Sequence, residues 1–201
     1  MLTINVYTLL VLRLCGGSYP NYILAKAAAL NNDTETTGSL FYPLYDKILN
    51  YWFPPTEDYD VCPCWSIPGQ YNVDSTITFV IEHHHHPLLL IEVKPPSHIH
   101  NETLREIAIA EISEHLHLVG PSNMYADQLY AISAIGKNWR ACYALKGEGS
   151  GQSVKGITKA KFSVLSGKKN AWNPDITLDA SWKALQEIVE TIKGYVAQSV
   201  A

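Results

Sequence analysis

The sequence predicts an α/β fold in which a mixed central sheet is flanked by helices. Two apolar runs rich in β-branched residues, 74–82 and 87–94, flank four histidines, a pattern typical of a β-hairpin. Apolar residues recur at helical spacing before and after this hairpin, and residues 138–145 alternate like a further strand. A chain of 201 residues is expected to form one domain over 1–201, with its core at about 35–145.

The predicted hairpin brings three chemically active residues together at its open end. If the turn is centred in the middle of His83–His86, antiparallel pairing sets Asp74 roughly opposite Lys94. Side chains alternate along a strand, so Glu92 and Lys94 share one face while Ile91 takes the other. An aspartate, a glutamate and a lysine are therefore expected at one strand end.

These residue types suit the hydrolysis of a phosphodiester. Mg²⁺ prefers oxygen ligands, and two carboxylates hold it while it keeps several waters. A bound metal lowers the pKa of a water and stabilises the charge that develops on a phosphodiester. A neighbouring lysine can orient that water or bind the phosphate.

The arrangement of Asp74, 17 intervening residues and Glu92-Val-Lys94 resembles the PD-(D/E)xK nuclease superfamily, which has the restriction-endonuclease-like fold. The resemblance covers about 35–145 through a few motif positions, and Val73 stands where the motif has proline. Glu92-Val-Lys-Pro-Pro96 also looks like a group of uncharacterised fungal proteins.

The resemblance implies a role for each motif residue. Asp74 and Glu92 would bind Mg²⁺, with Mn²⁺ as an alternative, and the Val93 carbonyl would be a third ligand. Lys94 would position the attacking water.

Two neighbouring helices are implied to contribute further side chains. Gln128, on a helix predicted over 124–135, would support Lys94 or the substrate. A first core helix, predicted over 36–51, often carries an acid that joins the metal site, for which Glu35 is the candidate and Asp46 the reserve.

The charge is unevenly distributed along the chain. The formal net charge is −4, but residues 137–169 hold eight basic residues and only Glu148 as an acid, a net of +7 against −11 elsewhere. Such a basic face can accept a phosphate backbone, or it is a solvated lysine-rich loop. The candidate nucleic-acid contacts are Lys137, Arg140, Lys155, Lys159 and Lys161.

Composition restricts the class of protein further. Four cysteines do not make a disulfide framework in a chain this long, which favours reduced thiols and an intracellular protein, cytoplasmic or nuclear. No run approaches the roughly 20 apolar residues of a membrane span, so no membrane partner is expected.

The other expected elements are local. The helices are expected over 22–30, 101–118 and about 179–197, an aromatic loop over 54–71, and an edge strand over 162–165. The histidine run, His83–His86, is expected as an exposed turn far from Glu92.

The function expected is metal-dependent hydrolysis of nucleic acid, DNA in preference to RNA. The main alternative is a catalytically inactive domain of the same fold that binds nucleic acid or a protein partner, since fold alone does not settle activity. A salt-bridged surface hairpin with no site, and a histidine-rich metal-binding protein, are the weaker alternatives.

Overall fold

The hairpin predicted from the sequence lies in the middle of the sheet. The computed structural model describes residues 18–66, 76–119, 123–124, 127–146, 157–163 and 172–199. Within them, β2 (Thr76–His83) and β3 (His86–Lys94) pair antiparallel. The turn is at His84 and His85, as predicted, with φ of 51° and 63°. Two consecutive positive φ angles match the twist of the flanking strands and give a tight connection.

The sheet is mixed, which confirms the predicted α/β class. Its order follows the chain from β1 (Tyr59–Ser66) through β2, β3, β4 (Gln128–Ile135) and β5 (Asn138–Lys146) to β6 (Ile157–Ser163). Only β3 and β4 are parallel among these pairs. A parallel pair requires a crossover, and helix α4 (Glu102–Val119) makes it.

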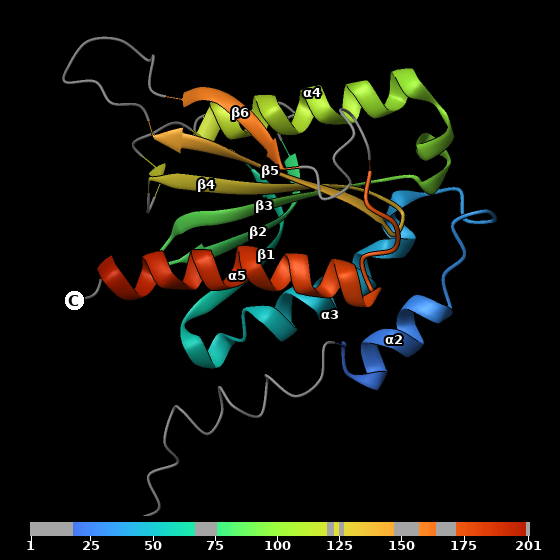
Figure 1. Ribbon diagram of the computed structural model, residues 1–201, viewed down its shortest axis with the longest axis horizontal. Helices are drawn as coiled ribbons and strands as arrows, with labels where there is room; N and C mark the ends of the chain where they lie inside the picture. Colours follow the sequence, from blue (N-terminus) through green and yellow to red (C-terminus); the bar gives the residue numbers. More distant parts are fainter. Residues whose placement is uncertain are drawn as a thin grey trace, which may run out of the picture.

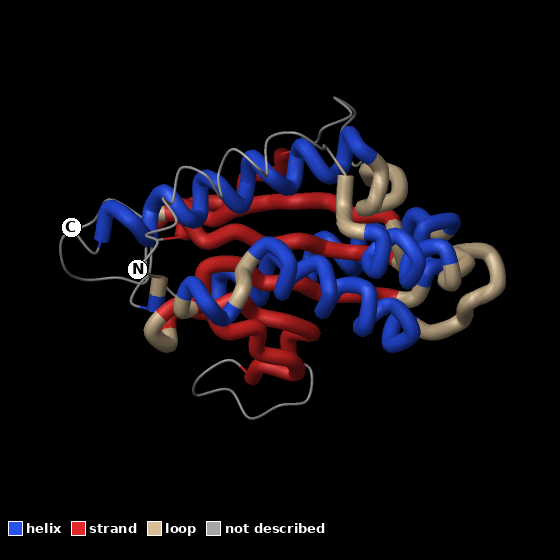
Figure 2. Tube along the Cα trace, turned by 90° about the horizontal axis from the view of Figure 1, so that it is seen from below, coloured by secondary structure: helices blue, strands red, loops and turns tan. Residues whose placement is uncertain are grey.

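Helices cover both faces of the sheet (Figure 1). Helix α4 packs on one face, over a cluster that includes Leu90 and Cys142, and we call this the α4 face. Figure 2 looks onto the other face, which α2 (Asn21–Ala28), α3 (Tyr42–Trp52) and α5 (Asp179–Ser199) cover. We call this second face the α5 face.

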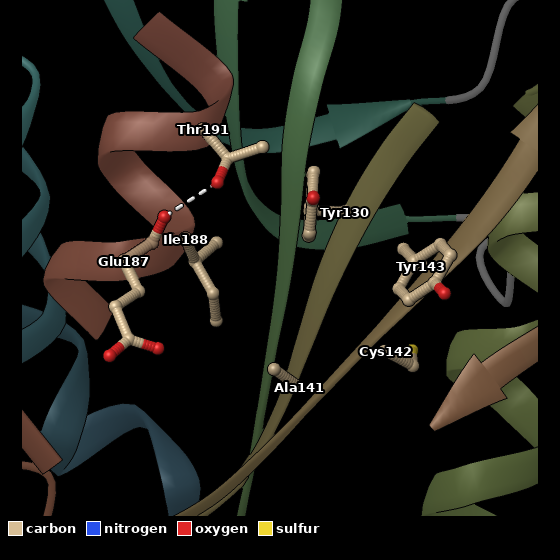
Figure 3. A pocket seen from close by; sticks show the side chains of 7 residues that line it. All are labelled: Tyr130, Ala141, Cys142, Tyr143, Glu187, Ile188 and Thr191. Atoms are coloured by element: carbon tan, nitrogen blue, oxygen red, sulfur yellow. Dashed lines mark hydrogen bonds between the residues drawn. The ribbon is translucent and has the colours of Figure 1, made fainter. Parts of the chain in front are cut away.

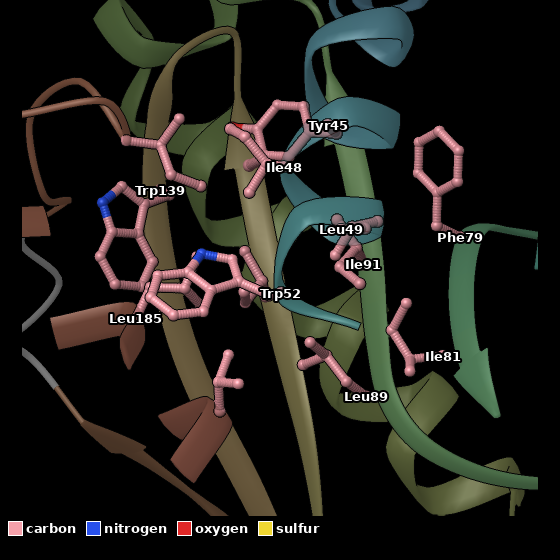
Figure 4. Close-up of a cluster of buried hydrophobic side chains, with 14 of the residues drawn as sticks. Tyr45, Ile48, Leu49, Trp52, Phe79, Ile81, Leu89, Ile91, Trp139 and Leu185 are labelled. Carbon is pink, nitrogen blue, oxygen red and sulfur yellow. The ribbon is translucent and has the colours of Figure 1, made fainter. Parts of the chain in front are cut away.

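The core of the α5 face is built by the apolar stripes that the sequence shows (Figure 4). Helix α3 buries Tyr45, Ile48, Leu49 and Trp52 against alternate residues of β2 and β3. This helix begins at Tyr42, later than the expected position 36, because residues 38–41 form a 3₁₀ turn before it. Hydrogen bonds pair several polar atoms inside this core. Tyr45 Oη donates to the Gly136 carbonyl at 3.0 Å, Trp139 Nε1 donates to Ser181 Oγ at 3.0 Å, and Trp52 Nε1 donates to Tyr19 Oη at 3.2 Å.

Two expectations for secondary structure were wrong, and the edge strand lies partly at residues other than those expected. The segment expected as a helix over 124–135 forms strand β4 from Gln128 onward. Its residues Ala131 to Ile135 are all buried, and a run buried on both sides is what a strand in the interior of a sheet requires. The aromatic loop expected over 54–71 contains strand β1, which pairs along β2. The edge strand expected over 162–165 instead begins at Ile157.

The turn between β4 and β5 tolerates only glycine. Gly136 has φ of +58°, and a Cβ there would lie 2.6 Å from Asn32 Oδ1 and 2.7 Å from the Pro96 Cβ. Its amide donates to the Lys94 carbonyl at 3.1 Å, so this turn fixes the end of β3 that carries Lys94.

Changing Gly136 to alanine is expected to lower the free energy of unfolding by about 2 kcal/mol or more, through strain at positive φ and through crowding. Gly194→Ala is the matched control, because Gly194 lies within α5 and nothing is within 4 Å of its added Cβ. This control is expected to stabilise by about 0.5–1 kcal/mol. Urea denaturation measures both, and equal effects would contradict the expectation.

Candidate active site

Glu92 and Lys94 share the α4 face of β3, as predicted. Lys94 Nζ lies 2.6 Å from Glu92 Oε1. Ile91 and Val93, the alternate residues, pack into the core of the α5 face. The pair stands at the carboxyl end of a strand whose preceding residues, Leu88 to Ile91, are buried.

The two oxygens of the Glu92 carboxylate have different surroundings. The residue is 6% exposed, so the carboxylate is almost wholly removed from water. Oε1 bonds Lys94, whereas Oε2 has no hydrogen-bond partner among the described residues. His115 Nδ1 is 3.8 Å from Oε2, beyond hydrogen-bond distance. A buried anionic oxygen without a partner is costly, and it is a place where a cation or a water would be stabilised.

A second carboxylate reaches Lys94 from helix α4. Lys94 Nζ lies 2.5 Å from Glu111 Oε2, and the Glu111 side chain is 41% exposed. Glu92, Lys94 and Glu111 are together called the carboxylate–lysine cluster. Glu111 was not among the site residues predicted from the sequence. The sequence does contain a pattern that could have pointed to Glu111: it is four residues before His115, so both side chains lie on one side of the helix.

The lysine in this cluster carries a positive charge at neutral pH. Burial alone would lower the pKa of Lys94, but the Glu92 and Glu111 carboxylates outweigh burial, and the net pKa is raised. At His98, burial and the Lys94 charge lower the pKa of the imidazole, against the opposing effect of Glu111. Lys94 is thus suited to stabilise negative charge rather than to accept a proton.

Polar side chains continue across the sheet from Glu92 on the α4 face. Ser133 on β4 is the neighbour of Glu92, and Arg140 on β5 is the neighbour of Ser133. Ser133 Oγ donates to the Ala108 carbonyl of α4 at 3.4 Å. Arg140 is only 4% exposed, and burial lowers the pKa of its guanidinium. Arg140 therefore lies inside the protein and does not form part of an exposed basic face, contrary to the expectation.

Gln128 is far from the cluster. Because β3 and β4 are parallel with Lys94 beside Ile135, Gln128 begins β4 at the opposite end, seven residues or roughly 23 Å away. Its Oε1 accepts a hydrogen bond from Tyr130 Oη at 2.7 Å. The expected role of Gln128 depended on a helix and is not supported.

Neither of the two acids considered on the N-terminal side makes an ion pair with Lys94 among the described residues. Helix α3 packs on the α5 face, and the exposed Asp46 accepts a hydrogen bond from Asn50 within that helix. Glu35 is half-buried in the loop before α3 and makes no side-chain hydrogen bond or ion pair with another described residue. Asp46 therefore lies on the other face of the sheet from Glu92, whereas the role expected for Glu35 stays a prediction.

The backbone at Val93 is tightly packed. Its amide donates to Thr78 Oγ1 at 3.1 Å, so a side chain of β2 takes the place of a backbone acceptor there. A Cβ on Gly38 would lie 2.8 Å from the Val93 carbonyl oxygen. The loop before α3 therefore lies directly against the carbonyl that was expected as a third metal ligand.

The remaining predicted residues are only partly described. Asp74 and Lys155 lie outside the described residues, and for Lys159 and Lys161 only the course of β6 is described. Lys137 follows Gly136 at the same end of the sheet as Lys94, and its Nζ lies 3.1 Å from Asp175 Oδ2. Lys137 is thus neutralised by an acid of the same chain.

Among the described residues, Glu92 and Glu111 are the two carboxylates in the carboxylate–lysine cluster that could bind a metal ion. No group of three or more histidine, cysteine, aspartate or glutamate side chains among these residues could hold a metal ion, and this includes the histidine turn. Mg²⁺ is commonly held by one or two carboxylates with several waters, so Glu92 and Glu111 suit it chemically. The unpaired Glu92 Oε2 provides an anionic oxygen for such an ion.

A pocket lies on the α5 face of the sheet (Figure 3). It has a volume of about 210 Å³ between strands β4 and β5 and helix α5, and its lining includes Tyr130, Tyr143 and Ile188. Glu92 points to the other face, so this pocket does not extend the candidate site.

Comparisons with known proteins do not assign the chain to a family. No protein-family model, no curated protein and no solved structure matches the chain. In the part of the chain that the structure describes, no helix is long and apolar enough to cross a membrane.

Proposed function

We propose that the protein is a metal-dependent nuclease that hydrolyses phosphodiester bonds of nucleic acid. The observation that carries the proposal is the meeting of Glu92, Lys94 and Glu111 at the end of a central strand, with Glu92 Oε2 left unpaired. This is the pairing of carboxylate and lysine that the resemblance to the PD-(D/E)xK superfamily implies.

The chemistry divides between the metal and the side chains of the cluster. A bound Mg²⁺ or Mn²⁺ would supply an activated water and neutralise charge on the phosphate. Glu92, with Asp74 as the expected second ligand, would hold it. Lys94, which is charged and 23% exposed, would orient the attacking water or contact a phosphate oxygen.

Nucleic acid is the proposed substrate, DNA in preference to RNA. The β4–β5 turn places Lys137, which pairs with Asp175 in the free protein, at the same end of the sheet as Lys94, where a backbone that reaches the cluster would pass. Each phosphate that is neutralised contributes about −0.9 to the slope of log affinity against log salt on duplex DNA. A binding curve that does not respond to salt would argue against this contact.

The test is a cleavage assay with plasmid, single-stranded DNA and RNA in Mg²⁺ and then in Mn²⁺. The unchanged protein is expected to cleave, and Glu92→Gln is expected to lose at least about 100-fold in rate, because an anionic ligand is removed from the reacting centre. Glu106→Gln, an exposed acid elsewhere on α4, is the matched control and should cleave normally. Equal rates for both variants would refute the assigned site.

A catalytically inactive binding module is the second candidate. Its supporting observation is that Lys94 bonds both carboxylates and so neutralises much of their charge. If the unchanged protein binds nucleic acid but cleaves no substrate in either metal, this second function replaces the first.

A further inference from the structure

The Lys94 ammonium occupies the space between two carboxylates that come from different elements. Nζ is 2.6 Å from Glu92 Oε1 on β3 and 2.5 Å from Glu111 Oε2 on α4. The two oxygens are therefore at most about 5 Å apart, and a small movement of the partly exposed Glu111 side chain would bring them within the roughly 4.2 Å that two oxygens on one Mg²⁺ can span. The cluster already holds a cation, and that cation is part of the chain.

A second observation indicates that this place is suited to a metal ion. Glu92 is more than nine-tenths buried, and its Oε2 has no hydrogen-bond partner among the described residues. An ammonium satisfies one oxygen of that carboxylate and leaves the other unpaired. A divalent cation with its waters can satisfy both oxygens, because it is a harder and more highly charged partner.

We propose that Glu92 and Glu111 together form a divalent-cation site, that Lys94 fills this site in the metal-free protein, and that metal binding displaces the Lys94 ammonium. The inference rests on the proposed function and deepens it in two ways. It assigns an acid of α4 to the metal, in place of the acid expected from the N-terminal side. It also means that Lys94 pairs with the two carboxylates only in the metal-free protein and leaves them when the metal binds.

The Lys94 ammonium can be displaced because Lys94 and Glu111 are partly exposed to solvent. The Lys94 side chain is 23% exposed and that of Glu111 is 41% exposed, so this end of the cluster opens to solvent. An ion can enter there, and the flexible lysine stem can carry the ammonium outward. The released ammonium would then be free to contact a phosphate oxygen or the attacking water.

Metal affinity tests the inference directly. Mg²⁺ binding is measured by calorimetry and Mn²⁺ binding by electron paramagnetic resonance, without nucleic acid. Lys94→Met should bind either ion at least about tenfold more tightly than the unchanged protein, because a competing positive charge is removed. Glu111→Gln should bind at least about tenfold more weakly, whereas Glu106→Gln, the exposed acid on α4, should bind normally.

A labelling experiment on the unchanged protein covers the case in which Lys94→Met does not fold. Acetic anhydride acetylates free amines, and mass spectrometry measures the rate at each lysine. Mg²⁺ should increase the acetylation rate of Lys94 several-fold, while the exposed Lys183 of α5 should react equally with and without the ion. A Lys94 rate that is unchanged or lowered by Mg²⁺ overturns the inference.

The outcomes separate this inference from the proposed function. If Glu111→Gln binds metal normally or Lys94→Met binds no more tightly, the inference is wrong. The proposed function still stands in that case, provided that Glu92→Gln loses both metal binding and cleavage. If Glu92→Gln also binds metal like the unchanged protein, both are wrong.

Discussion

Replacing Lys94 with methionine is expected to reduce cleavage by at least about 1000-fold and to lower the free energy of unfolding by about 2 kcal/mol. The loss of cleavage follows from removing the one cation of the carboxylate–lysine cluster. The loss of stability follows because Glu92 is 6% exposed and its carboxylate would be left buried without its charge-assisted partner. Removing one partner of a wholly buried ion pair costs more than this. The cost is smaller here because Lys94 and Glu111 are partly exposed to solvent, which screens their charges.

A double variant distinguishes the two effects. In Glu92→Gln with Lys94→Met, no uncompensated carboxylate remains on β3, so most of the lost stability should return while cleavage stays lost. Lys183→Met on the exposed side of α5 is the matched control and should change neither quantity. The measurements are urea denaturation followed by circular dichroism and the plasmid assay. Full cleavage by Lys94→Met would show that Lys94 is not required for the reaction.

Steep unfolding in alkali is the second large effect expected. Burial raises the pKa of Tyr19 and Tyr45 well above the usual tyrosine value, and burial raises the pKa of Cys142 to about 12 in spite of Arg140. Each group stays protonated in the fold while the unfolded chain ionises, so the stability that each contributes is complete below its unfolded pKa and is lost as pH rises. Each costs about 1.4 kcal/mol per pH unit, so three together cost about 4 kcal/mol per unit above pH 10.

The raised pKa of Lys94 acts in the same direction, since the unfolded chain loses that proton first. A typical stability of about 5–15 kcal/mol would then be exhausted near pH 12. Urea denaturation at pH 8, 10, 11 and 11.5 measures the slope.

Tyr45→Phe identifies the origin of the alkaline effect. This variant loses a hydrogen bond to the Gly136 carbonyl at every pH, but it also removes one of the titrating groups whose pKa the fold raises. The pH slope should therefore fall by about 1.4 kcal/mol per pH unit, whereas Tyr22→Phe, at a residue that is 53% exposed, should leave it unchanged. An unaltered slope in Tyr45→Phe would assign alkaline unfolding to other groups.

Local pattern alone was sufficient for much of the fold. Alternation of β-branched residues predicted the hairpin and its turn, and helical spacing predicted α5 to within two residues of its ends. For α3 it predicted the C-terminal end to within one residue but placed the start six residues too early. The same alternation placed Glu92 and Lys94 on one face of β3. These properties depend on residues close in the chain, so the sequence carries them directly.

Tertiary structure decided the composition of the site. Gln128 was expected on a helix, but the parallel pairing of β3 with β4 places it at the far end of a strand. Arg140 was expected at the surface, but it is buried beside Ser133 on the face of the sheet that α4 packs against. Neither outcome is encoded by local spacing, because both depend on which buried face each distant element meets.

Glu111 shows the same division most clearly. The sequence by itself determined that Glu92 and Lys94 end a buried strand and that Glu111 and His115 share one side of a helix. Only the packing of α4 on the sheet brought Glu111 to Lys94 and left the second Glu92 oxygen buried without a hydrogen-bond partner among the described residues. The physical reason is that the crossover between parallel strands sets the position of this helix, and that position is a long-range property of the chain.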